Sequence, residues 1–359
     1  MMAYYRLPKN IDQIIKNELG EQFIQFVERH NDKSWDWFYI SSNSNITMDT
    51  IKAHPEKPWE WDGVSANPNL TIDIINEYPD KNWEWYDISQ NPNITWGIFK
   101  DNPDNPWNIT ALSCNPNITM KIIEENIEIP WDGKGISMNP NLTMDIITKH
   151  PEMSWHWWRI SQNHNITMNI VRENPDMPWC WAGLSLNPNL TLDMIEEYPD
   201  KPWEWTGVSQ TLKITIDILK DNPDKPWCWY GLSSNIHLTT DIIEAYPNKR
   251  WRWRYMTSNN ITVEYIKNHI KHINYYIIHL SNSIHLTMDM IDISPDERWN
   301  WDDISDHTLD IENRYLELAK KHLMAFKIQT YWRRANYNPE YLLCRKRLMH
   351  ECDILGIID

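Results

Sequence analysis

The strongest constraint on the fold of this chain is an internal repeat with a period of 24 residues. One column of the repeat is a threonine that returns in nine successive units: Thr47, Thr71, Thr95, Thr119, Thr143, Thr167, Thr191, Thr215 and Thr239. A fixed period of this length indicates a tandem-repeat fold, in which each unit packs on its neighbours. We expect about twelve units to occupy residues 21–310.

Tryptophan forms two further columns. The first contains Trp35, Trp59, Trp83, Trp107, Trp131, Trp155, Trp179, Trp203, Trp227, Trp251 and Trp299. The second lies two residues later and contains Trp37, Trp61, Trp85, Trp157, Trp181, Trp205, Trp229, Trp253 and Trp301. Together the columns hold 20 of the 23 tryptophans in the chain. Because each buried indole removes about 200 Å² from water, we expect these columns to form the spine of a continuous core.

A single unit, residues 67–89, predicts two short helices. Residues 67–69 (Asn-Pro-Asn) are turn-forming, Thr71 stands where an N-cap belongs, and Pro79 ends the first helix. Asp80 can then cap a second short helix that carries both tryptophans. Five units place a glycine towards the end of this helix, where it permits a left-handed residue or close helix packing. These are Gly63, Gly135, Gly183, Gly207 and Gly231.

Helices of about eight residues are unstable alone in water, because nucleation costs more free energy than two turns return. We therefore predict an all-α fold of two-short-helix repeats stacked into an elongated solenoid. With layers about 9 Å apart, it would be a rod or arc roughly 100 Å long. A leucine-rich repeat has a similar period, but its second apolar anchor position holds polar residues here, including Asp62, Lys134 and Arg254.

The ends of the chain depart from the repeat. Residues 1–20 are predicted to form an N-terminal cap, and residues 21–30 the helix of an incomplete first unit. Residues 263–280 lack the tryptophans and are a predicted bend or joint. Residues 311–359 are predicted to form a basic helical C-terminal segment. The net charge of the chain is -16, so the repeat body is strongly acidic.

The unit at residues 187–209, NPNLTLDMIEEYPDKPWEWTGVS, resembles the tryptophan-rich 24-residue repeats found in proteins of giant DNA viruses of the mimivirus group. The tail at residues 327–348, KIQTYWRRANYNPEYLLCRKRL, is similar to a C-terminal segment that recurs in proteins of those viruses. The resemblance covers nearly the whole chain. It implies a viral source and a tandem-repeat fold, but no reaction and no functional residues.

The position between the two tryptophans is the first candidate site. Its chemistry changes from unit to unit while its place in the repeat stays fixed, which suits a surface that reads a partner. The candidate partner residues are Asp36, Glu60, Glu84, Asp132, His156, Glu204 and Arg252. A merely solvated face is the alternative.

Catalysis and metal binding are not predicted. Acidic residues two positions after the threonines, such as Asp49 and Asp73, read as first-turn helix acids and not as a cation ladder. Cys180 and Cys228 occupy equivalent slots two units apart, too far apart to share a zinc ion. No catalytic motif occurs in the sequence. We therefore expect a protein that is not an enzyme and holds no cofactor.

The basic tail is the second candidate site. Its contact residues would be Lys320, Lys321, Lys327, Arg333, Arg334, Arg345, Lys346 and Arg347. They could bind nucleic acid, an anionic membrane or an acidic partner, and Ile328-Gln329 with Arg333 weakly matches a calmodulin-target helix. Equally, the tail could cap the last repeat and place its basic face on the acidic body.

These patterns lead to a functional hypothesis. We predict a non-catalytic scaffold that binds protein partners along an extended acidic surface. The alternatives are a structural component of a virion or virus factory, and nucleic-acid or calmodulin-like binding through the tail. Without an apolar leader or an apolar run of membrane-spanning length, and with five cysteines in no disulfide pattern, we expect the host cytoplasm or the virion and not secretion.

Overall fold

The computed structural model describes residues 9–256, 261, 265, 281, 286–293, 295–307, 309, 314–315, 317–322 and 324–325. Every regular element in this part of the chain is a helix, which confirms the predicted all-α repeat solenoid. Nearly all of the predicted joint at residues 263–280 lies outside the described residues.

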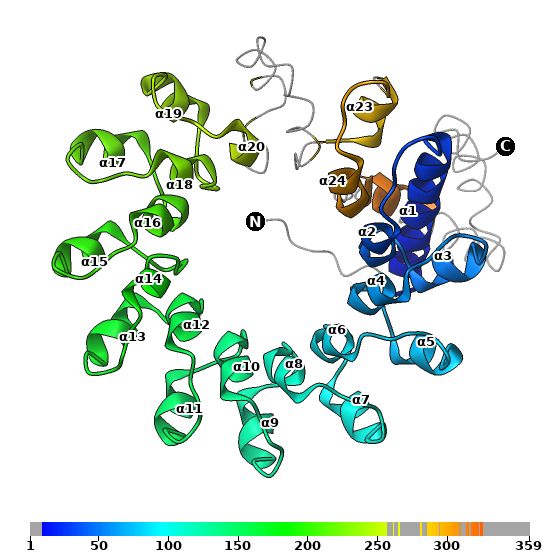
Figure 1. Ribbon diagram of the computed structural model, residues 1–359, viewed down its shortest axis with the longest axis horizontal. Coiled ribbons are helices and arrows are strands. Elements are labelled where there is room, and N and C mark those ends of the chain that lie inside the picture. The colour runs from blue at the N-terminus through cyan, green and yellow to red at the C-terminus, as the bar shows by residue number, and fades with distance from the viewer. Residues whose placement is uncertain are drawn as a thin grey trace, which may run out of the picture.

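The helices form two concentric layers (Figure 1). The inner layer contains α2 (Trp37–Ser42), α4 (Trp61–Ala66), α6 (Trp85–Gln90), α8 (Ile109–Cys114), α10 (Gly133–Met138), α12 (Trp157–Gln162), α14 (Trp181–Leu184), α16 (Trp205–Thr211), α18 (Trp229–Ser233), α20 (Trp253–Met256) and α24 (Trp301–Asp306). The outer layer contains α3 (Met48–Ala53), α5 (Ile72–Glu77), α7 (Trp96–Asp101), α9 (Met120–Glu125), α11 (Met144–Lys149), α13 (Met168–Glu173), α15 (Leu192–Glu197), α17 (Ile216–Asp221), α19 (Thr240–Ala245) and α23 (Met288–Ile293). The long helix α1 (Lys9–Arg29) lies beside α2 and α3.

The solenoid follows a ring, and its first and last repeats meet (Figure 1). Helix α24 packs on α2 much as α2 packs on α4. The rod or arc that the stacking argument predicts is therefore wrong in its path, although the stacked repeats themselves are confirmed. The repeat pattern specifies how neighbours pack, but a small rotation at each junction decides whether the stack runs straight or returns on itself.

The outer helices begin as the sequence predicts. Each of the nine threonines is an N-cap, and the Thr47 and Thr95 hydroxyls accept hydrogen bonds from the first turn of α3 and α7. The inner helix of the unit at residues 67–89 begins four residues later than predicted. Asp80 lies in a turn, and the N-cap of α6 is Glu84, the residue between the two tryptophans.

The fully buried spine of the ring is aliphatic. Side chains such as Ile40, Val64 and Ile88 of the inner helices have no solvent exposure, and Leu70 in the connecting loop is equally buried. Five tryptophans are buried, and the other described ones are half-buried. The expectation of a tryptophan spine thus needs correction. The indoles are large enough to bridge neighbouring repeats, but one edge stays near the surface.

The two tryptophan columns make different contacts. The first column donates its indole N–H to the carbonyl at the end of the preceding outer helix, as Trp83 Nε1 does to Tyr78 O at 2.9 Å. This bond satisfies a carbonyl that has no partner within the helix. The second column packs against the first column of the next unit, edge to face, as in Trp61 and Trp83 with ring centroids 5.1 Å apart.

Asparagine and serine tie successive repeats together. The buried Asn67 amide donates to the carbonyls of Ser41, Asn43 and Ile46 in the preceding unit, at 2.8, 3.1 and 3.1 Å. The buried Ser41 hydroxyl accepts from the backbone N–H of Glu60, at 3.0 Å. Equivalent bonds recur in other described units, so the buried asparagine and serine side chains of these two columns are paired between units.

The same contacts close the ring. Asp36 N donates to Ser305 Oγ at 3.1 Å, and Asn43 Nδ2 donates to Ser305 O at 2.9 Å. Trp301 meets Trp35 edge to face with centroids 4.9 Å apart. The first repeat therefore receives from the last repeat the same kinds of contact that described units such as the one containing Glu60 and Asn67 receive from the unit before them.

Glycine lets the inner helices approach closely. A Cβ on Gly63 would lie 2.4 Å from the backbone oxygen of Phe38 on the neighbouring inner helix. Gly135, Gly183 and Gly231 face an equivalent carbonyl. These glycines lie in the interior of their helices, so close packing and not a left-handed conformation explains them. Tight spacing inside and wider spacing outside produce the curvature seen in Figure 1.

Helix α1 joins the predicted cap to the first repeat without a break at residue 20. Its last third takes the place of the first outer helix, because Trp35 Nε1 bonds His30 O at 2.8 Å as other units do. The start of the C-terminal segment packs on the first half of α1. Tyr315 hydrogen-bonds Asp12, and His322 lies 2.9 Å from Glu18.

Candidate interaction surface

The variable position between the tryptophans is the N-cap of the inner helices. The carboxylates of Asp36, Asp132 and Glu204 accept hydrogen bonds from the first turns of α2, α10 and α16. Glu84 and His156 do the same through single bonds. Sequence reasoning missed this role because the predicted second helix began several residues earlier.

Capping leaves most of these side chains accessible. Glu60, Glu84, His156, Glu204 and Arg252 are exposed, although Glu84, His156 and Glu204 are also caps. Glu60 makes no side-chain capping bond. The position therefore remains open to a partner, and partner binding through it stays a prediction.

Capping has an electrostatic consequence at Glu204. Partial burial disfavours its charged form, but hydrogen bonds from the Gly207 amide and from Thr206 outweigh burial and lower the pKa of the carboxyl. Glu204 thus acts as an ionised cap. Its charge complements the positive end of the helix.

The seven candidate residues lie in separate groups around the ring. Asp36, Glu60 and Glu84 belong to three successive inner helices. Asp132 and His156 belong to another adjacent pair. Of the remaining two candidates, Glu204 caps α16 and Arg252 directly precedes α20. Only the first group has further acidic neighbours on its helices.

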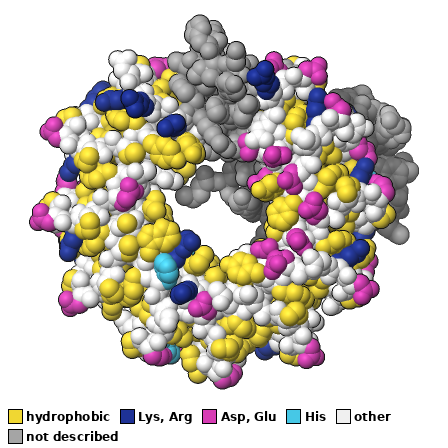
Figure 2. All heavy atoms as spheres, in the orientation of Figure 1, with side chains coloured by type: hydrophobic (Ala, Val, Ile, Leu, Met, Phe, Trp, Pro, Cys, Tyr) yellow, Lys and Arg dark blue, Asp and Glu magenta, His cyan; other side chains and the backbone are white. Residues whose placement is uncertain are grey.

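Ring closure extends that first group into an acidic arc. We define the acidic arc as eight carboxylates on α24, α2, α4 and α6 and at their N-caps: Asp302, Asp303, Asp306, Asp36, Glu60, Asp62, Glu84 and Asp87. These four helices and their N-caps contain no lysine or arginine. On the face seen in Figure 2, acidic side chains gather beside the central opening on this side of the ring.

The acidic arc is electrostatically uncompensated. None of its eight carboxylates forms an ion pair within the described part of the chain. Partial burial raises the pKa of Asp87, and the nearby charges of Glu84 and Asp62 raise it further. Like charges therefore crowd one another on this surface.

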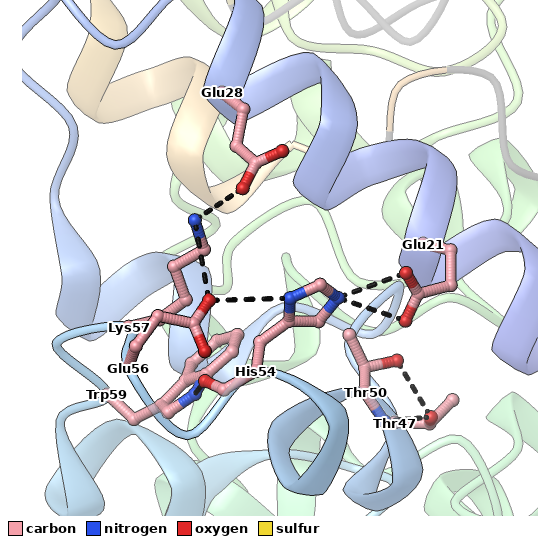
Figure 3. A network of polar contacts seen from close by, with 8 residues as sticks. All are labelled: Glu21, Glu28, Thr47, Thr50, His54, Glu56, Lys57 and Trp59. Carbon is pink, nitrogen blue, oxygen red and sulfur yellow. Dashed lines mark hydrogen bonds and ion pairs between the residues drawn. The ribbon is translucent and has the colours of Figure 1, made fainter.

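Acidic residues on the outside of the ring are arranged differently. Glu28 of α1 lies 2.5 Å from Lys57, and the Glu21 carboxylate lies 3.0 Å from His54 (Figure 3). On the opposite side of the ring, Arg172 and Glu197 are paired at 2.6 Å. The outer layer thus neutralises many of its charges between neighbouring units. Sequence alone could not separate the two groups, because α24 and α2 are more than 260 residues apart.

The far side of the inner layer has a different character. Arg159 lies over the Trp158 ring at 4.6 Å, and Tyr230 meets Tyr255 with their hydroxyl oxygens 3.1 Å apart. Lys134 is also exposed here. This part of the inner surface is aromatic and partly basic, so the inner surface is electrostatically polarised across the ring.

The other charged residues that the sequence analysis considers as site candidates are either exposed or outside the described part of the chain. Asp49 and Asp73 are exposed first-turn acids of α3 and α5, as their spacing predicts. Lys320 and Lys321 are exposed. Other tail candidates lie outside the described residues: Lys327, Arg333, Arg334, Arg345, Lys346 and Arg347.

Comparisons of the chain with protein-family models, with curated proteins and with solved structures found no match. Within the described residues, no group of three or more histidine, cysteine or acidic side chains could hold a metal ion. None of the described helices is both long and apolar enough to cross a membrane. The function is therefore inferred from the geometry of the chain itself.

Proposed function

We propose that this protein is a non-catalytic scaffold that binds basic protein partners along the acidic arc. The observation that supports the proposal is the set of eight carboxylates on four consecutive inner helices without an ion pair among the described residues. Such a surface attracts positive charge, speeds association with a basic partner and disfavours acidic ones. The fixed repeat framework holds the arc, while the N-cap side chains vary its chemistry.

Nucleic acid is a poor occupant for this surface. Lysine and arginine neutralise most of the phosphate charge in such complexes, and the four helices and their caps lack both while their eight carboxylates repel phosphate. Binding through the basic tail stays a separate prediction, since most of its candidate residues lie outside the described part of the chain. Assembly end to end as a virion component also loses support, because α24 and α2 occupy each other's end faces.

The proposal can be tested with a short peptide of alternating lysine and glycine as a probe. We expect binding that weakens as salt concentration rises, because exposed charges are screened. A triple variant, Glu60→Gln, Asp62→Asn and Glu84→Gln, should bind about tenfold more weakly at low salt. Fluorescence anisotropy of the labelled peptide measures both effects.

A matched control removes the same charge elsewhere. The triple variant Asp176→Asn, Asp200→Asn and Asp224→Asn changes three exposed loop acids outside the acidic arc. It should retain most of the affinity. Equal losses in the two triple variants would show that net charge and not the arc attracts the peptide, and the proposal would then fail.

A further inference from the structure

One column of the repeat lies two residues before the first tryptophan and fills a slot between neighbouring units. Its members are Lys33, Lys57, Lys81, Asn105, Ile129, Met153, Met177, Lys201, Lys225, Lys249 and Glu297. Six are lysines and three are long apolar side chains. The slot therefore usually takes a long side chain with an apolar stem.

The structure shows what the lysines do there. The ammonium groups of Lys81, Lys201 and Lys249 lie 4.8, 5.1 and 4.8 Å from the ring centroids of Trp61, Trp181 and Trp229 in the preceding units. These are cation–π contacts.

Two other lysines of the column reach a carboxylate instead. Lys57 pairs with Glu28, and Lys225 lies 3.8 Å from Glu196. Both carboxylates precede their lysine by 29 residues. The slot thus offers an ammonium group either the tryptophan face or a polar side chain on the outer helix.

Asn105 leaves this slot open. It has the shortest side chain in the column, and a cavity of about 430 Å³ lies beside it. The cavity is lined by Ile75 and Pro79 near the end of α5, and by Trp83 and Trp85. The Asn105 Nδ2 atom is buried without a hydrogen-bond partner among the described residues, so asparagine does not replace what the longer side chains supply.

We propose that this cavity receives a lysine side chain from a protein partner. Its apolar stem would lie among the aliphatic and proline side chains, and its ammonium group would reach the face of Trp85 or the Asn76 amide. Trp85 stands where Trp61 stands for Lys81. Asn76 stands 29 residues before Asn105, where Glu28 and Glu196 stand for their lysines. Lysines of this chain therefore already make, in other repeats, the contacts that we propose for the lysine of the partner.

Neighbouring positive charge does not prevent this binding. Lys81 contributes to the lining of the cavity, but its ammonium group is committed to Trp61. Lysines also fill three consecutive slots at Lys201, Lys225 and Lys249. The architecture therefore accommodates ammonium groups in adjacent slots.

The inference deepens the proposed function and rests on it, because the lysine belongs to a basic partner. Glu84 and Asp87 of the acidic arc belong to the same repeat as Trp85. The arc would attract the partner through long-range charge, whereas the cavity would select one side chain by shape and cation–π contact.

The test uses full-length protein and three five-residue peptides that carry lysine, acetyl-lysine or norleucine between glycines. Resonances of fluorinated tryptophans report binding at individual indoles. We expect the lysine peptide to shift the Trp85 resonance and to bind at least about fivefold more tightly than the other two. Equal binding of all three peptides, or no shift at Trp85, would overturn the proposal.

Two variants make the test specific. Asn105→Lys fills the slot from within the chain, as six other units do, and should abolish the Trp85 shift. Lys201→Asn opens the equivalent slot and should create a new response at Trp181. Thermal unfolding checks that both variants fold. A persistent Trp85 shift in Asn105→Lys would contradict the cavity as the binding site.

The two proposals can fail separately. If Asn105→Lys leaves binding of the alternating lysine–glycine peptide intact while the acidic-arc variant loses it, the proposed function stands and the cavity inference fails. If the five-residue peptide binds at Trp85 but the arc variant behaves like its control, the cavity stands as a lysine site and the arc proposal fails.

Discussion

At the scale of single residues, the ring depends on small polar side chains as well as on tryptophan. Ser65 is fully buried, accepts from the Glu84 N–H at 2.9 Å and donates to the Trp61 carbonyl at 2.8 Å. Its hydroxyl therefore joins one inner helix to the N-cap of the next. A buried donor without its acceptor costs more than the bond contributes, so this position has little tolerance for change.

Replacing Ser65 by alanine should lower the free energy of unfolding by about 1–3 kcal/mol, because the Glu84 N–H loses its buried acceptor. Urea denaturation followed by tryptophan fluorescence measures the loss. Ser42→Ala is the control, because the half-buried Ser42 hydroxyl only donates to Tyr39 O within its own helix. Equal effects of the two substitutions would contradict a role for Ser65 in stacking.

Some residue roles could be predicted from the sequence and others could not. The threonine N-caps were predictable, because Thr47 bonds an amide three residues away. The partner of Ser41 lies 19 residues away, and Asn67 reaches back as far as 26 residues. Repeat spacing shows that such residues recur, but it does not show which atoms of a neighbouring unit they meet.

At the scale of helices, stacking decides where each element begins and how closely it packs. The inner helices are four to seven residues long, too short to be stable alone. The sequence indicates Asp80 as the N-cap of the helix that carries the tryptophans, whereas α6 is capped by Glu84, a residue that the variable chemistry of its position assigns to a partner surface. The correct boundary follows from Trp83, whose indole must remain in the loop to reach Tyr78 O.

Gly63 of an inner helix and Gly97 of an outer helix have different surroundings, and this difference gives a prediction. Gly63→Ala should destabilise the ring by several kcal/mol, because the new Cβ would lie 2.4 Å from the Phe38 carbonyl oxygen, and backbone cannot easily move. Gly97→Ala in outer helix α7 should be neutral or stabilise by up to about 1 kcal/mol, since only Thr95 Oγ approaches, at 3.7 Å. Thermal unfolding distinguishes these outcomes, and similar midpoints for both variants would argue against close inner packing.

At the scale of the whole molecule, closure changes which residues are neighbours. The acidic arc exists because α24 packs on α2, and one repeat alone could not reveal it. The path of the solenoid depends on a small rotation repeated at every junction, which the spacing of threonines and tryptophans does not encode. The junction between the last and the first repeats, which we call the seam, is stabilised in the outer layer by Asp292 of α23. Its carboxylate lies 2.9 Å from Arg29 and 2.7 Å from His30.

This seam predicts a pH dependence. Partial burial opposes ionisation of Asp292, but hydrogen bonds from His30 and Arg29 outweigh it and lower the pKa of the carboxyl below its ordinary 3.8. The unfolded chain therefore binds the proton more readily. The stabilisation is fully present above pH values near 3.8 and is lost as the pH falls through the lower pKa of the folded state.

Asp292→Asn should accordingly lower the free energy of unfolding by about 1 kcal/mol at pH 7, a modest value because the site is partly exposed. The difference from the unmodified protein should shrink as the pH falls below about 3.8. Urea denaturation at pH 7, 5 and 3 follows the difference. Asp296→Asn is the control, because that side chain is 98% exposed and lies 3.8 Å from Lys33. A difference for Asp292→Asn that persists unchanged at pH 3 would show that its ion pairs do not stabilise the closed ring.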